Sequence, residues 1–216
     1  MNASARRGEV RFSSLNPAER DAALVLLTRA FNDDPFMMHI LEGKNNIGRS
    51  EALQALMDYS LAIREHFDWP ILGLWDGQVL SGVAALSLPA DTDPWPQTLK
   101  QRFTIVKELL GLKGSMRLAK YSEISKRERP IALHIYLGVL GVDPAAQGRG
   151  FGKQLLDRVQ DFSESYPGST GVFLDTENPR NVPFYEHCGY EVISRHNMES
   201  VSICCLFRAN RDHRRT

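Results

Sequence analysis

The chain has 216 residues, with 26 basic and 26 acidic side chains. This length predicts one domain of ordinary size with a substantial buried core. The balanced charge argues against nucleic-acid binding, which usually goes with a basic surplus. It also provides no net field that would recruit the protein to an anionic membrane surface.

The cysteines and histidines give no sign of a disulfide framework or a metal site. The three cysteines, Cys188, Cys204 and Cys205, are odd in number and lack metal-ligand spacing, and no two histidines stand at i, i+4. No apolar run follows the N-terminal arginines as in a secretory signal, and none is long enough to span a bilayer. We therefore expect a cytoplasmic, metal-free protein whose cysteines are small packing residues.

The first part of the chain predicts strands and helices in alternation. In chain order these are a strand at residues 9–12, helices at about 16–32 and 50–66, and strands at 71–75 and 79–88. Asn16 is a suitable cap for the first helix, because Pro17 fits the first helical position and Glu19 can reach back to the cap.

Two dipeptides and one long segment mark the breaks between these elements. Asp34-Pro35 is expected to end the first helix in a loop. Asp76-Gly77 predicts a tight hairpin turn with positive φ. Residues 91–132 begin with a Pro/Asp loop and continue as Lys-, Arg- and Leu-rich stretches, which predict two helices with solvated basic faces.

From residue 133 the alternation becomes tighter. The predicted strands are residues 133–142, 171–175, 190–195 and 201–208, the predicted helices are 150–165 and 181–188, and a frayed tail follows from 209. Strands interleaved with a few helices predict one mixed α/β sheet in a single domain, residues 1–216.

A glycine-rich turn joins the strand at 133–142 to the helix at 150–165. It reads Gln147-Gly148-Arg149-Gly150-Phe151-Gly152 and is followed by Lys153. The first amides of a helix have no intrahelical partner and point outward at the positive end of the helix dipole, so they bind anions. Glycines lack the Cβ atoms that would keep a pyrophosphate at a distance, and Arg149 and Lys153 can add charge at the rim.

Two other nucleotide loops fit this turn less well. The ATP-type loop requires Gly-Lys-Ser/Thr, which is absent. The dinucleotide fingerprint expects its first glycine earlier and an acidic residue about twenty positions further on. Asp175 lies near that distance, so a nucleotide-dependent oxidoreductase stays open as the last-ranked alternative.

These residues resemble the GNAT superfamily of N-acetyltransferases. The most specific motif of that family is Gln/Arg-x-x-Gly-x-Gly/Ala after a strand ending in Val-Asp-Pro, and Gln147, Gly150 and Gly152 fill it. A second stretch, Asn178-Pro-Arg-Asn181-Val-Pro-Phe-Tyr185-Glu-His-Cys-Gly189-Tyr190, resembles the family's Asn-rich turn, helix, tyrosine and Gly-Phe/Tyr ending. The resemblance is close over 133–208 and weaker over 9–88, and 91–132 corresponds to a variable helical insertion on the substrate side.

The resemblance implies a twisted mixed sheet that splays at the cofactor strands and is flanked by helices. It implies an acetyltransferase that uses acetyl-CoA as cosubstrate and moves the acetyl group to a primary amine by direct attack on the thioester. Either asparagine of the second stretch could lie beside the cofactor arm. The implied cofactor-binding residues are Leu140, Gly141, Val142, Gln147, Gly148, Arg149, Gly150, Phe151, Gly152, Lys153, Asn178, Asn181 and Tyr185.

The chemistry needs a proton donor and a proton acceptor. An amine must be neutral to attack a thioester, yet alkyl amines have pKa values of about 10 in water, so a base is required. The resemblance implies Tyr185 as the donor to the leaving thiolate. His134 is the preferred base because its pKa suits neutral pH, although a structural histidine is equally consistent, and Glu177 and Asp34 are further candidates.

Strand alternation provides the geometric argument for His134. Over residues 133–142, His134, Tyr136, Gly138 and Leu140 are expected to share one face. That face would meet the acceptor beside the thioester.

Other features leave the acceptor open. Residues 33–36 together with Trp69, Trp75 and Trp95 could line an acceptor pocket, but we expect a loop and packing aromatics there. A small amine, an antibiotic, an amino acid, a peptide N-terminus and a protein lysine all fit the pattern. The alternatives in function are a CoA-binding regulatory module without turnover, and a transferase using another acyl group or a hydroxyl acceptor. No nucleic-acid or membrane partner is expected, and the oligomeric state is left open.

Overall fold

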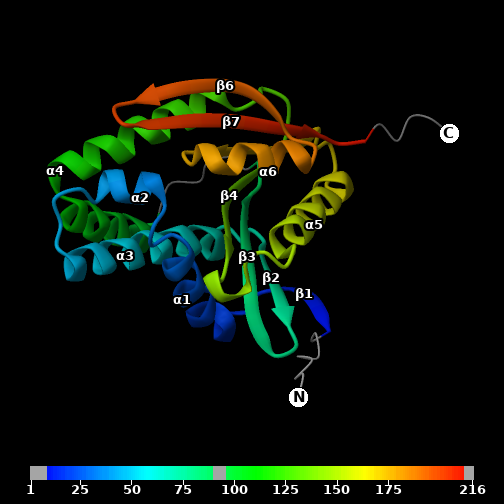
Figure 1. Ribbon diagram of the computed structural model, residues 1–216, viewed down its shortest axis with the longest axis horizontal. Helices are drawn as coiled ribbons and strands as arrows, with labels where there is room; N and C mark the ends of the chain where they lie inside the picture. The colour runs from blue at the N-terminus through cyan, green and yellow to red at the C-terminus, as the bar shows by residue number, and fades with distance from the viewer. Residues whose placement is uncertain (1–8, 90–95, 212–216) are drawn as a thin grey trace, which may run out of the picture.

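A twisted mixed sheet organises the computed structural model, which describes residues 9–89 and 96–211 (Figure 1). Within these residues the sheet is open and has seven strands in the order β1-β2-β3-β4-β5-β7-β6. Neighbouring strands are antiparallel except for β4 and β5, which are parallel. The strands are β1 (Val10–Ser14), β2 (Ile71–Asp76), β3 (Val79–Ser87), β4 (Ile135–Val142), β5 (Gly171–Thr176), β6 (Glu191–Met198) and β7 (Val201–Ala209).

Helices cover both faces of the sheet, and α5 lies on the opposite side from α1 and α3 (Figure 1). The helices are α1 (Arg20–Ala30), α2 (Pro35–Ile40), α3 (Asn46–His66), α4 (Gln97–Glu128), α5 (Phe151–Ser165) and α6 (Val182–His187), with short 3₁₀ turns η1 (Pro17–Glu19), η2 (Pro144–Ala146) and η3 (Pro179–Asn181). This arrangement confirms the predicted single α/β domain.

The sheet separates two apolar cores. The α3-side core joins α1, α2, α3 and α4 to one face and includes Leu27, Leu61 and Val83. The α5-side core joins α5 and α6 to the other face. Cys204 lies in the α5-side core and Cys205 in the α3-side core, so the expectation that these two buried cysteines are packing residues on opposite faces is confirmed.

Asparagine and aspartate caps begin the N-terminal helices. Asn16 accepts from the amide of Glu19, whose side chain returns the bond to the amide of Asn16, as predicted. The break expected at Asp34-Pro35 is confirmed, since α1 ends at Ala30, but the loop expected over residues 33–36 is wrong, because Asp34 caps α2 and Pro35 is its first residue. The sequence pattern is the same at both sites, a capping side chain followed by proline, and it starts a helix in each case.

The segment predicted as two helices forms α4, which is interrupted once. Gly111 has φ 71° and ψ −177°, outside the helical region, so the chain turns there between two helical halves. Glycine adopts positive φ without the steric cost that a Cβ brings. The predicted Pro/Asp loop at the start of residues 91–132 lies largely outside the described residues. The tail predicted from 209 begins too early, because β7 includes Ala209, and its residues from 212 also lie outside.

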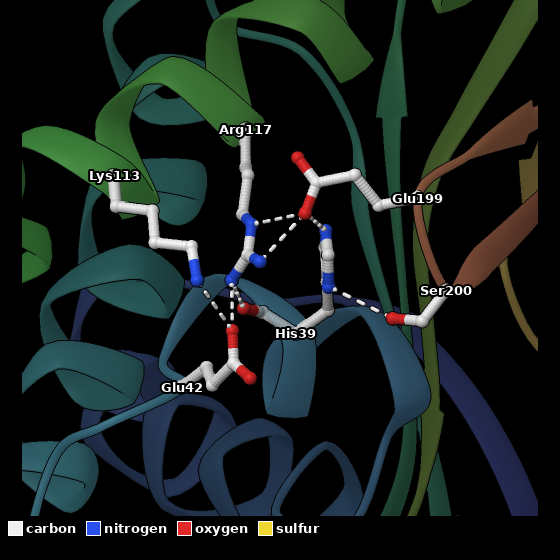
Figure 2. A network of polar contacts seen from close by, with 6 residues as sticks. All are labelled: His39, Glu42, Lys113, Arg117, Glu199 and Ser200. Atoms are coloured by element: carbon white, nitrogen blue, oxygen red, sulfur yellow. Dashed lines mark hydrogen bonds and ion pairs between the residues drawn. The ribbon is translucent and has the colours of Figure 1, made fainter.

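A network centred on Arg117 ties α2, α4 and the β6–β7 hairpin together (Figure 2). Its guanidinium donates to Glu199 through Nη2 at 2.6 Å, to Glu42 through Nη1 at 2.8 Å and to the carbonyl of His39 at 2.6 Å. Lys113, one turn earlier on α4, also reaches Glu42, at 3.0 Å. The Arg117 side chain is only 7% exposed, so this network fixes the position of α2 against the sheet.

Candidate active site

The parallel pair β4 and β5 opens toward its C-terminal end. Only Ile135 and Tyr136 of β4 pair with β5, whereas β3 stays paired with β4 as far as Val142. The edge of β4 beyond Tyr136 therefore has unpaired backbone facing the gap. Unpaired strand edges accept an additional extended chain through main-chain hydrogen bonds.

A bulge at Gly138 changes which side chains face each side of β4. Leu137 pairs with β3 one position out of step with Val139, so Gly138 is the extra residue. Tyr136 and Val139 consequently pack in the α3-side core, whereas Leu140 packs against the α5-side core. The expectation that Tyr136 and Leu140 share one face is therefore wrong, because alternation was assumed to run without interruption.

Two glycines of β4 allow close approach by other elements. A Cβ at Gly138 would collide with the guanidinium of Arg64, and a Cβ at Gly141 would lie 2.7 Å from Leu27 of α1. Gly141 thus lets α1 pack against β4, and its neighbours Leu140 and Val142 point to the α5 side. The backbone of these residues stays on the open edge.

The glycine turn takes the conformation that the sequence required of it. Gly148 has φ 75° and Gly150 has φ 80°, both left-handed, and a Cβ on either would meet no atom within 4 Å. Gly150 is the N-cap of α5 and has no side chain that could cap the helix, so the first amides of α5 receive no side-chain hydrogen bond from the N-cap. Phe151 buries its side chain in the α5-side core and leaves only its amide at the turn. A Cβ at Gly152 would lie 3.2 Å from the ring of Phe184.

The polar side chains of the turn have protein partners. Gln147 folds back and donates to the carbonyl of Val142 at 3.3 Å. Arg149 lies 2.6 Å from Asp76, and Lys153 lies 2.5 Å from the carboxylate one turn later in α5. Anion binding at this turn would therefore come from backbone amides first, with the cations at the rim.

The two asparagines of the second motif differ in their roles. The side chain of Asn178 caps η3 and accepts from the amide of Arg180 at 3.1 Å. Asn181 has helical dihedral angles at the start of α6, and its side chain makes no capping hydrogen bond. Asn181 is thus the asparagine with a side chain available to a ligand.

Tyr185 lies on α6, and its ring is held among aromatic neighbours. The residue is 8% exposed, and its ring centroid lies 5.9 Å from that of Tyr190. Burial raises the pKa of Tyr185, and the nearby carboxyls of Glu177, Asp175 and Asp34 raise it further. The hydroxyl consequently keeps its proton at neutral pH and can act as a donor.

Asp175 is a buried carboxyl that three hydroxyl groups satisfy. Tyr121 and Ser125 of α4 each donate to it at 2.5 Å, and Tyr136 of β4 lies 3.3 Å away. Burial raises the pKa of Asp175, and these hydrogen bonds oppose that effect. A carboxylate enclosed in this way is not open to a ribose hydroxyl, which removes the main support for the dinucleotide alternative.

Glu177 follows β5 directly and differs from the other carboxyls near Tyr185. Its Oε1 atom is buried and makes no hydrogen bond within the described residues, although the residue as a whole keeps some exposed surface. Burial raises the pKa of Glu177 well above its ordinary value, and Asp175 and Asp34 raise it further. Asp34, in contrast, accepts from the amides of Phe36 and Met37 at 3.0 and 3.2 Å.

His134 lies immediately before β4 and not beside Tyr185. Its Nδ1 is 2.8 Å from the carbonyl of Ala132, and its ring meets the edge of Phe173. Burial lowers the pKa of His134. Since Ile135 pairs with Val172, the backbone of His134 is roughly 17 Å along the sheet from the end of β5 at Thr176, at about 3.3 Å per residue.

Trp69 and Trp75 do not form an acceptor pocket with residues 33–36. Trp75 bonds to Ser13 at 3.1 Å and Trp69 stacks on Phe67, both near the β1–β2 edge, as the expectation of packing aromatics requires. Trp95 lies outside the described residues. Of residues 33–36, Phe36 contacts Tyr121 at a ring-centroid distance of 4.5 Å. This contact brings α2 close to the acidic residues at the end of β5.

Part of the chain is similar to known acetyltransferases. An acetyltransferase (GNAT) domain family matches residues 101–192. The N-alpha-acetyltransferase RimI of Mycobacterium tuberculosis is 30% identical over 101 residues, which cover 46% of this chain and 63% of that protein. Residues 101–192 of the chain are therefore similar to the GNAT acetyltransferase domain.

Other GNAT proteins resemble the chain in shorter stretches or in fold. The mycothiol acetyltransferase of Beutenbergia cavernae is 41% identical over 59 residues, 27% of this chain and 20% of that protein. The chain thus spans less than two thirds of either relative. A Corynebacterium glutamicum structure described as histone acetyltransferase HPA2 and related acetyltransferase has a TM-score of 0.67 at 16% identity, covering 92% of this chain and 95% of that one. Its GNAT fold agrees with the open, splayed sheet.

The described residues contain neither a grouping of metal ligands nor a membrane-spanning helix. Among residues 9–89 and 96–211, no three or more His, Cys, Asp and Glu side chains are grouped so that they could hold a metal ion. In the same part of the chain, no helix has both the length and the apolar character needed to cross a membrane.

Residues on α4 were missed at the sequence level. Tyr121 and Ser125 stand at i, i+4, so they share a face, and this spacing was the available signal. It was masked because the basic residues of the same GNAT segment dominate its composition. The sequence suggested Asp175 only as a ribose ligand. Its proximity to the carboxyls of Asp34 and Glu177 depends on tertiary structure.

Proposed function

We propose that this protein transfers an acetyl group from acetyl-CoA to a primary amine. One observation carries the proposal: the open edge of β4 runs directly into the two left-handed glycines at the start of α5. An extended arm lying on that edge would place its pyrophosphate against the free amides. The similarity of residues 101–192 to the GNAT acetyltransferase domain supports the same cosubstrate.

The residues fit acetyl-CoA along its length. The backbone near Leu140 and Val142 would pair with the pantetheine arm, and the amides of residues 148–153 would hold the pyrophosphate. The space a Cβ would fill at Gly148 and Gly150 is empty of protein atoms, as a phosphate cradle requires. Asn181 would contact the arm, because the side chain of Asn178 is already a cap.

The protein's own residues would provide positioning and protons. When bound, acetyl-CoA supplies a thioester, whose acyl carbon bonds to the amine nitrogen as the carbon–sulfur bond breaks. Tyr185 would donate its hydroxyl proton to the leaving sulfur and regain one from the acylated nitrogen. His134 stays a prediction as the base, and its place at the far end of β4 does not favour it.

The test is product formation by the purified protein. Acetyl-CoA would be incubated with butylamine, cadaverine, phenethylamine and a lysine-containing peptide, and mass spectrometry and thiol release would detect transfer. We expect acetylated amine and stoichiometric CoA thiol. Binding of acetyl-CoA without any product would instead support a non-catalytic CoA-binding module, and faster transfer from propionyl-CoA would reassign the acyl group.

A pair of matched variants tests the proton donor. Tyr185→Phe should lower kcat by about 10²–10⁴-fold, the usual contribution of a general acid, while acetyl-CoA binding is kept. Tyr190→Phe removes a hydroxyl that is also buried and has no hydrogen-bond partner in the part of the chain that the structure describes, so it should retain activity. Full activity in Tyr185→Phe would contradict the donor role.

A further inference from the structure

We propose that Glu177 is the proton acceptor of this reaction, taking a proton from the ammonium group of the acceptor. This inference rests on the proposed function. It assigns the base to a residue at the end of β5 and not to the strand that carries His134.

The argument begins with what each nearby carboxyl already binds. Asp34 accepts two backbone amides as the cap of α2. Asp175 accepts hydrogen bonds from the hydroxyls of Tyr121 and Ser125 at 2.5 Å and from a third hydroxyl at 3.3 Å. Glu177 alone of the three has a buried oxygen, Oε1, with no hydrogen-bond partner among the described residues, while hydrogen bonding with its own backbone and with Tyr121 lowers the pKa of its carboxyl. A buried acceptor without a donor is costly, so an incoming N–H group would gain a hydrogen bond there.

The position of Glu177 relative to Tyr185 fits a division of labour. Asp175 points to the hydroxyls of α4 on the α3 side of the sheet, and Glu177, two residues later, is influenced by Tyr121 and Asp34 from that same side. Tyr185 belongs to the α5-side core. The carboxyls of Glu177 and Asp175 are nevertheless close enough to raise the pKa of Tyr185. The acceptor and donor thus approach the opening between β4 and β5 from opposite faces.

The electrostatics of this region raise the proton affinity of Glu177. The groups facing Glu177 are the carboxyls of Asp34 and Asp175 and the hydroxyls of Tyr121 and Tyr185. Arg129 stacks over Tyr136 and lowers the pKa of Asp175. Burial raises the pKa of Glu177 first, and the other carboxyls raise it further. A carboxyl with a raised pKa accepts a proton more readily than an ordinary glutamate does.

The proton balance is closed. An ammonium R–NH₃⁺ gives one proton to the Glu177 carboxylate and becomes R–NH₂, whose lone pair forms the new N–C bond. The second proton on that nitrogen passes to Tyr185 as the Tyr185 proton goes to sulfur. Glu177 then releases its proton to solvent, so each turnover yields one amide, one thiol and one proton.

The first test is the pH profile of kcat/KM with butylamine for wild type, Glu177→Gln and the matched control Glu186→Gln, which is exposed on α6. We expect Glu177→Gln to lose about 10²–10⁴-fold at neutral pH. Its residual rate should rise about tenfold per pH unit, because only amine that is already neutral reacts. The control should match wild type. A rate within about threefold of wild type and an unchanged profile would overturn the proposal.

The second test needs no turnover and keeps this inference separate from the proposed function. The melting temperature is measured with butylammonium chloride against sodium chloride at pH 8. We expect butylammonium to stabilise wild type and Glu186→Gln but not Glu177→Gln. An equal shift in all three, or none in wild type, would overturn the ammonium site. If Glu177→Gln does not fold, Glu177→Asp keeps the acid and should retain the wild-type pH dependence at a lower kcat.

A wild type that forms no product but shows the butylammonium shift would contradict the acetyl transfer and support the ammonium site. A wild type that forms product with no dependence on Glu177 would do the reverse.

Discussion

Substitution of Gly150 separates the cost of backbone strain from the loss of a ligand. Gly150 has φ 80°, and a Cβ there meets no atom within 4 Å. Gly150→Ala therefore carries only the left-handed penalty, about 1–2 kcal/mol. In a domain of this size that lowers Tm by about 2–8 °C. Gly168 has the same φ of 80° and an ordinary nearest contact of 3.9 Å, so Gly168→Ala is a matched control with the same cost.

The ligand response is what distinguishes the two positions. At an acetyl-CoA concentration a hundred times Kd, a native-state ligand stabilises by about 2.7 kcal/mol. Wild type and Gly168→Ala should show that full thermal shift. Gly150→Ala should show a smaller one, and Gly150→Glu none, since its carboxylate would occupy and repel the pyrophosphate. A normal shift in Gly150→Glu, or a lost shift in Gly168→Ala, would refute the assignment of the cofactor turn.

Two further predictions concern stability. A Cβ at Gly82 would lie 2.8 Å from Leu155 Cδ1. Gly82→Ala should therefore lower the free energy of unfolding by about 1–3 kcal/mol, and Leu155→Ala by about 2–5 kcal/mol. In denaturant unfolding, the double variant should lose less than the sum of the two. Lys113 and then Arg117 lower the pKa of Glu42 to about 2, so its stabilising effect is present above the unfolded pKa of about 4.3 and is lost as pH falls toward that lower value. Glu42→Gln should thus melt slightly below wild type at pH 7, and the gap should close in acid; a gap that persists at low pH would contradict this.

Local signals in the sequence predicted most of the elements. The capping residues at Asn16, the hairpin at Gly77 and the glycines at 148 and 150 act through backbone conformation, which depends on the residue itself. The same local signal at Asp34-Pro35 was interpreted as the end of one helix, although it is the start of another. The error came from reading proline as a breaker without considering the aspartate before it as a cap.

Features that depend on neighbours in space were not predictable in the same way. The bulge at Gly138 arises from the pairing of β4 with β3 and from the guanidinium of Arg64 above it. The carboxyls of Asp34 and Glu177 come together only through the packing of α2 against the sheet. Their chemistry differs because of partners that no sequence spacing records, so the sequence named Glu177 as a candidate but could not rank it.

The network at Arg117 also bears on the order in which the chain folds. Its bonds to His39 and Glu199 span 78 and 82 residues, whereas β4, α5, β5 and α6 follow one another within residues 135–187. Closing long loops is entropically slower than closing short ones. The glycine turn and Tyr185 therefore belong to a segment that can assemble early. Helix α2 docks last, because its contacts with Arg117 and Glu199 require the β6–β7 hairpin to be formed. In hydrogen exchange, amides of α2 should open at lower free energy than those of α5.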